Sequence, residues 1–123
     1  MLTLAIEILG AGVVVGMILA VIALVAPSKP PARILASLHG LLVIVGYGVL
    51  IDALITEPPR GAMTGTQAFG MVGAVLLGAA ILLGIGSIVL HVRRQHMPGI
   101  AIGIHASVAI AGYVMLFVYW LAG

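Results

Sequence analysis

The sequence has no cysteine and very few charged residues. The absence of cysteine excludes disulfides, thiolate metal sites and thiol catalysis, so a metal would have to be held by histidine, methionine or carboxylate ligands. Only 7% of the residues are charged, with five Lys or Arg against three Asp or Glu. Five basic residues are too few to form a nucleic-acid surface, and we expect no nucleic-acid partner.

What remains is largely apolar, since 63% of the 123 residues are hydrophobic. A water-soluble domain of this size could not bury that much apolar surface. A helix crosses the hydrocarbon of a bilayer with about 20 apolar residues, so the chain is long enough for four crossings. The composition therefore predicts an all-α integral membrane protein, with residues 1–123 forming a single transmembrane domain in the lipid bilayer.

Four apolar runs predict helices at about residues 2–26, 34–55, 67–92 and 99–121. Clusters of proline and glycine separate them, and the short connections predict a four-helix bundle of two antiparallel hairpins. The first run has no positively charged segment before it, so we expect a retained helix and not a cleaved signal peptide.

The basic residues indicate the topology. Four of the five lie in the first and third connections: Lys29, Arg33, Arg93 and Arg94. By the positive-inside rule these connections are cytoplasmic, and both termini and the connection that carries Glu57 lie on the non-cytoplasmic side. Glu7 and Asp52 are then expected at the non-cytoplasmic interface. The expected location is the bacterial inner (plasma) membrane.

An internal repeat is predicted by a shift of 66 residues, which lays a unit at about 67–123 over one at about 1–61. The second and fourth helices match best, through three pairs: His39 with His105, Gly46 with Gly112, and Tyr47 with Tyr113. The first and third helices match more weakly, for example Gly12 with Gly78. Because histidine and tyrosine are scarce in this chain, the matches predict two tandem hairpins related by a parallel repeat.

His39 and His105 are the residues most suggestive of chemistry. In a parallel repeat they lie at the same depth, roughly 10 Å from the cytoplasmic interface. Two imidazoles at one level can ligate one haem iron from opposite faces of the porphyrin. A neutral histidine can also form a structural hydrogen bond between helices or belong to a proton or ion path, and the sequence leaves these alternatives open.

Other residues fit a haem site around this pair. Gly46 and Gly112, two helical turns from the histidines, would make room for a porphyrin, and Tyr47 and Tyr113 would flank the pocket. The haem propionates would need cationic or hydrogen-bonding partners on the cytoplasmic side. The residues available there are Arg33, Arg93, Arg94, His91 and His96. The last two histidines can equally be solvated residues of the connection.

The pattern over residues 34–50 and 100–116 resembles the small four-helix membrane b-type cytochromes. This resemblance implies haem b held between histidines of neighbouring helices, and electron exchange with a quinone or a partner protein. Many members of that group hold two haems on four histidines, whereas only His39 and His105 lie deep in helices here. We therefore expect one haem, no catalytic residue, and an electron-transfer protein or membrane anchor subunit in place of a complete enzyme.

Two other functions remain open. One is a small proton-coupled transporter or channel subunit, working as a homodimer because four helices enclose little space. The other is a non-catalytic accessory subunit of a membrane complex. A visible haem spectrum would separate the cytochrome from both, and proton flux in liposomes would separate the transporter from the accessory subunit.

Overall fold

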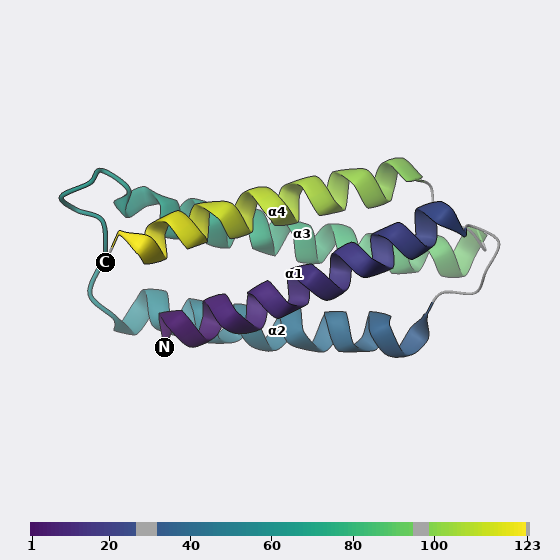
Figure 1. Cartoon of the computed structure of the whole chain (residues 1–123), viewed down its shortest axis with the longest axis horizontal. Coiled ribbons are helices and arrows are strands. Elements are labelled where there is room, and N and C mark those ends of the chain that lie inside the picture. Colours follow the sequence, from purple (N-terminus) through teal and green to yellow (C-terminus); the bar gives the residue numbers. More distant parts are fainter. Residues whose placement is uncertain (27–31, 95–98, 123) are drawn as a thin grey trace.

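The computed structural model describes residues 1–26, 32–94 and 99–122, and this part of the chain forms four α-helices (Figure 1). They are α1 (Leu2–Val25), α2 (Arg33–Thr56), α3 (Gln67–Arg94) and α4 (Gly99–Leu121). The ends lie within two residues of the predicted ones. All four are long and apolar enough to cross a membrane, which confirms the prediction of an all-α four-helix bundle with helices suited to a bilayer.

The connection between α2 and α3 shows why the helices end where they do. Pro58 and Pro59 have no backbone N–H to continue α2, and its last helical bond runs from the Glu57 N–H to the Ala53 carbonyl. Further on, Gly61 and Gly65 have φ values of 75° and 71°. Only glycine adopts such angles without strain, so the turn before α3 depends on both residues.

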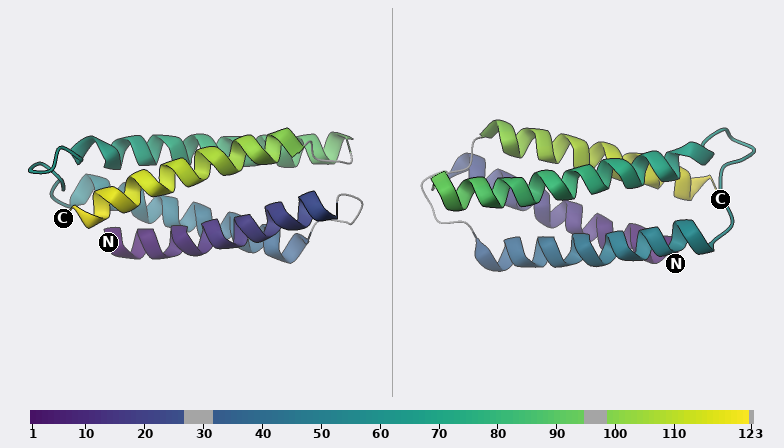
Figure 2. Two further views of the ribbon diagram at one scale, coloured as in Figure 1. Left: turned by 45° about the horizontal axis from the view of Figure 1, so that its top comes forward. Right: turned by 180° about the vertical axis from the view of Figure 1, so that it is seen from behind.

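The bundle consists of two hairpins, with α1 packed on α2 and α3 packed on α4. The hairpins lie against each other as two layers (Figure 2), joined where α1 meets α4 and where α2 meets α3. Both ends of the chain lie at the same end of the bundle as the α2–α3 connection (Figure 1).

Buried side chains concentrate in one half of the bundle, which we call the packed half: residues 2–12, 46–57, 67–80 and 112–122. Leu9, Leu50 and Leu116 are its largest fully buried side chains. The other half, residues 13–25, 33–45, 81–94 and 99–111, contains His39 and His105 and is called the histidine half. Of the side chains described in it, only Ser87 is buried.

Burial follows the same pattern in the two hairpins. On α2 and α4 the buried positions correspond with an offset of 66, as Gly46, Leu50 and Ala53 with Gly112, Leu116 and Tyr119. On α1 and α3 they correspond with an offset of 68, as Leu2, Ala5, Ile6, Leu9 and Gly12 with Gly70, Gly73, Ala74, Leu77 and Ala80. By burial the counterpart of Gly12 is therefore Ala80, and not Gly78 as a uniform shift of 66 predicts.

Candidate functional site

His39 on α2 and His105 on α4 meet across the two hairpins. Both side chains are half-buried, their ring centroids lie 6.2 Å apart, and the ring planes are inclined by 82°. They lie in the middle of the histidine half, seven residues before the packed half begins at Gly46 and at Gly112. The structure thus brings together the two residues that the sequence singles out.

Each imidazole is hydrogen-bonded to the other helix of its own hairpin. The His39 Nδ1 donates to the Gly12 carbonyl at 2.8 Å, and the His105 Nδ1 donates to the Ala80 carbonyl at 2.9 Å. A carbonyl oxygen can only accept, so the proton of each neutral ring is on Nδ1. Both Nε2 atoms therefore keep a lone pair with which to bind a metal or accept a hydrogen bond.

Two glycines lie directly beneath the imidazole rings. A Cβ atom on Gly16 would lie 2.7 Å from the His39 Cε1, and one on Gly84 would lie 3.1 Å from the His105 Cε1. The sequence shows these glycines only as small residues of the first and third helices. The signal that could have found them is a small residue followed four positions later by glycine, as in Gly12 with Gly16 and in Ala80 with Gly84.

Gly46 and Gly112 are placed where the helices of each hairpin touch. A Cβ on Gly46 would lie 2.9 Å from the Leu9 Cγ, and one on Gly112 would lie 3.0 Å from both the Leu76 Cβ and the Leu77 backbone nitrogen. Close helix packing accounts for both glycines. The room that they were expected to give a porphyrin is taken by these neighbours.

Tyr47 and Tyr113 join the two hairpins within the packed half. The Tyr113 hydroxyl donates to the Ile6 carbonyl of α1 at 3.2 Å. The Tyr47 hydroxyl reaches α3, where a Cβ on Gly78 would lie 2.8 Å from it. Both tyrosines therefore help to hold the two layers together on the packed side of the histidine pair.

The cationic residues expected to bind propionates are spread over the histidine end of the bundle. Arg33 begins α2 and Arg93 lies in the last turn of α3, and both are exposed. Arg94 ends α3, and His91 lies one turn earlier in the same helix. Lys29, His96 and the side chains of His91 and Arg94 lie outside the described residues. The propionate partners stay a prediction.

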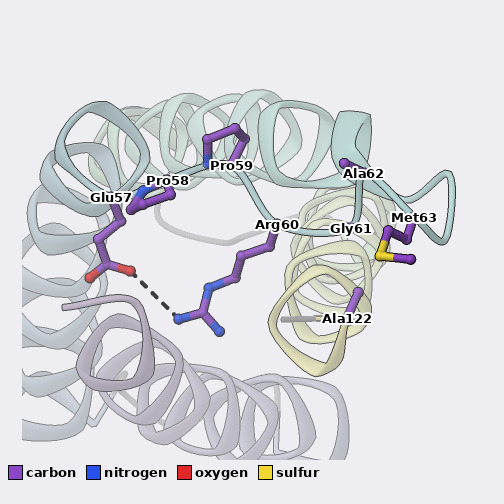
Figure 3. Close-up of a pocket in the computed structure, with 8 residues that line it drawn as sticks. All are labelled: Glu57, Pro58, Pro59, Arg60, Gly61, Ala62, Met63 and Ala122. Atoms are coloured by element: carbon purple, nitrogen blue, oxygen red, sulfur yellow. Dashed lines mark ion pairs between the residues drawn. The ribbon is translucent and has the colours of Figure 1, made fainter.

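A second polar cluster, which the sequence did not reveal, lies at the opposite end of the bundle around a cavity of about 520 Å³ (Figure 3). The Glu57 carboxylate accepts the Leu2 N–H at 3.1 Å and pairs with the Met1 ammonium at 2.6 Å. The hydrogen bond from that ammonium, and then the one from Leu2, hold the pKa of Glu57 below its ordinary value.

Arg60 completes this cluster and ties it to α4. Its backbone N–H donates to the Tyr119 hydroxyl at 3.1 Å, and its Nη1 donates to the Trp120 carbonyl at 3.5 Å. Its Nη2 lies 3.7 Å from the Glu57 carboxylate, as the dashed line in Figure 3 marks. A guanidinium at the carboxyl end of a helix stabilises that end. Because Glu57 holds the start of α1 and Arg60 holds the end of α4, the cluster acts as a clamp between the hairpins.

The donor set limits which metal could bind. Within the described residues no group of three or more His, Cys, Asp or Glu side chains comes together. A zinc ion takes three or four protein ligands, which two imidazoles cannot supply. A haem brings four nitrogen ligands of its own and needs only two axial ones. Two imidazoles without further protein ligands therefore fit a haem better than a bare metal ion.

Comparison with known protein families, with curated proteins and with solved structures found no match for this chain. The function of this chain is therefore inferred from the geometry of the histidine pair.

Proposed function

We propose that this protein is a membrane b-type cytochrome in which His39 and His105 ligate one haem b. The observation that supports the proposal most is the meeting of the two rings from opposite hairpins, with both Nε2 atoms free. Metal–imidazole bonds are about 2 Å long, so two rings on opposite sides of one ion have centroids roughly 6 Å apart. The observed separation of 6.2 Å agrees with this spacing.

The residues around the histidines would serve such a site by orienting the ligands. The carbonyls of Gly12 and Ala80 hold each ring in one tautomer and increase the donor strength of its Nε2. A bound haem would supply reversible one-electron chemistry. Electrons would pass to or from a quinone or a partner protein, in a homodimer or as an anchor subunit of a larger complex.

The uneven packing of the bundle favours a haem in the histidine half. The packed half is filled by its own side chains, including those against Gly46 and Gly112. In the histidine half only one described side chain is buried, so a haem bound there would displace fewer contacts between the two layers. A haem placed on this side has Arg33, Arg93 and Arg94 at the same end of the bundle for its propionates.

The proposal includes a duplicated hairpin and an orientation. Matching burial on α2 and α4, and the matching carbonyl acceptors of the two histidines, support a tandem repeat. The acceptor precedes His39 by 27 residues and His105 by 25, so the second hairpin has two residues fewer between these positions. The basic connections would face the cytoplasm of a bacterial cell, with both termini on the other side of its inner membrane.

The first test is an absorption spectrum of the purified protein, oxidised and then reduced with dithionite. We expect the reduced α band of low-spin haem b in the native chain and its loss in His39→Ala and in His105→Ala. Leu41→Ala, at an exposed position on the same helix as His39, serves as the control and should keep the band. A colourless native protein from haem-replete cells would overturn the proposal, and proton flux in liposomes would then test the transporter.

A further inference from the structure

The two histidine hydrogen bonds share a feature on the helix that accepts them. In each hairpin the accepting carbonyl belongs to the residue four positions before a glycine: Gly12 before Gly16, and Ala80 before Gly84. In an α-helix the carbonyl of residue i points at the N–H of residue i+4, so a side chain on residue i+4 lies beside that oxygen. Glycine at this position leaves the oxygen open to a second donor.

The imidazole rings use the space that these glycines leave. The three heavy atoms nearest to a Cβ built on Gly16 all belong to His39, and those nearest to one on Gly84 all belong to His105. No backbone atom of a neighbouring helix is among them, in contrast to Gly112, where the nearest atoms include the Leu77 nitrogen. Close approach of two helix backbones therefore does not account for Gly16 and Gly84.

We infer that Gly16 and Gly84 are positioning residues, each of which opens a backbone carbonyl to the Nδ1–H of a histidine and thereby leaves the Nε2 free as a ligand. The inference deepens the proposed cytochrome function, on which its consequence for haem rests. The hydrogen-bonding part concerns the protein alone and holds whichever group the Nε2 atoms bind.

The two positions differ in how much room they leave. A methyl group on Gly16 would lie 2.7 Å from the His39 ring, closer than real Cβ contacts occur, and one on Gly84 would lie 3.1 Å from the His105 ring. His39 must therefore move in a Gly16→Ala variant, whereas His105 needs only a small shift in Gly84→Ala. We expect the same order in every measurement, with the Gly16 variant more affected.

The tautomer of each histidine can be read directly by NMR of haem-free protein labelled with ¹⁵N-histidine. His39→Gln and His105→Gln variants assign the signals. We expect both native rings to be protonated on Nδ1, and Gly16→Ala to shift His39 toward the other tautomer while His105 keeps its own. Gly40→Ala and Gly103→Ala, whose Cβ atoms would contact no other helix within 4 Å, should change neither ring. An unchanged tautomer of His39 in Gly16→Ala would overturn the inference.

Destabilisation of the whole bundle by Gly16→Ala is separated from this effect by a double-mutant cycle. If Gly16 only makes room for the imidazole, Gly16→Ala should lower the free energy of unfolding in the native background and leave it unchanged in His39→Ala. An equal loss in both backgrounds would show that the glycine serves helix packing, and would overturn the inference.

Haem titration then tests the consequence for the cofactor. Removing the hydrogen-bond partner of a ligating histidine typically weakens metal binding by about 10- to 100-fold. We expect the haem dissociation constant to rise about tenfold or more in Gly16→Ala, less in Gly84→Ala, and not in Gly40→Ala. If the native protein binds no haem but the tautomers respond as expected, the positioning role stands and the cytochrome fails. If haem binds and the tautomers do not respond, the cytochrome stands and the positioning role fails.

Discussion

The packed half and the histidine half of this bundle are built from similar apolar helices but hold together differently. In the packed half large side chains such as Leu50 and Leu116 are fully buried between the layers, and the Glu57–Arg60 clamp closes its end. In the histidine half the ring pair connects the layers, and near the end of the bundle Gly99 of α4 lies against the Leu24 side chain of α1. The difference indicates that the stability of the fold and the candidate chemistry are carried by separate residues.

The largest expected effect comes from removing a buried leucine of the packed half. Leu50→Ala leaves a cavity between the hairpins and should lower the free energy of unfolding by about 2 to 3 kcal/mol. Leu42→Ala, two turns away on α2 in the histidine half, removes a half-buried side chain and should cost about 1 kcal/mol. SDS-driven unfolding in mixed micelles measures both.

Leu41→Ala is the control for this pair, since Leu41 is an exposed neighbour of Leu42 and should change stability by less than about 0.5 kcal/mol. Equal losses for Leu42→Ala and Leu50→Ala would contradict the division into two halves. Such a result would mean that the histidine half is packed as firmly as the other.

A smaller effect should distinguish the two packing glycines. A methyl on Gly112 meets the Leu77 nitrogen at 3.0 Å and the Gly73 oxygen at 3.1 Å, so α3 and α4 must move apart. A methyl on Gly46 meets only side-chain atoms of Leu9 and Ile8, at 2.9 to 3.1 Å, and no backbone atom of α1 is among the three nearest. We expect Gly112→Ala to cost about 1 to 2 kcal/mol and Gly46→Ala clearly less, by the same unfolding assay. The reverse order would show that the two hairpins are not packed in this way.

Much of the fold follows from the sequence because the bilayer leaves few alternatives. Long apolar runs must be helices there, and the prolines at 58 and 59 mark the end of the second one. The pairing of His39 with His105 was also predictable, because histidine is scarce in this chain and these two residues match at the shift of 66. These predictions needed only the composition and order of the residues.

The roles of the glycines were not predictable in the same way, because the role of a glycine depends on which atoms a side chain at its position would contact. Gly46 was expected beside a porphyrin and packs against Leu9, whereas Gly16 had no individual role and lies under His39. Which helix face meets which neighbour depends on the register of α1 against α2. A single shift of 66 also hid the offset of 68 between α1 and α3.

The smallest expected effect concerns the clamp at the end of the packed half, and it depends on pH. The Met1 ammonium and the Leu2 N–H keep the pKa of Glu57 below its ordinary value. The Glu57 carboxylate therefore binds a proton less readily in the folded chain than in the unfolded chain. The stability that the carboxylate contributes is therefore present above about pH 4.3, the ordinary value for glutamate, and is lost as the pH falls through the lowered pKa.

Glu57→Gln should remove this part of the pH dependence and leave the rest of the acid unfolding curve in place. Asp52→Asn, which changes an exposed carboxylate near the end of α2, serves as the matched control and should keep the native slope. Trp120 donates to the Thr3 hydroxyl beside the clamp, so its fluorescence reports the opening of this end. If the native and Glu57→Gln curves have the same slope between neutral and acid pH, the carboxylate does not hold the hairpins together, and the packed half depends on its buried side chains alone.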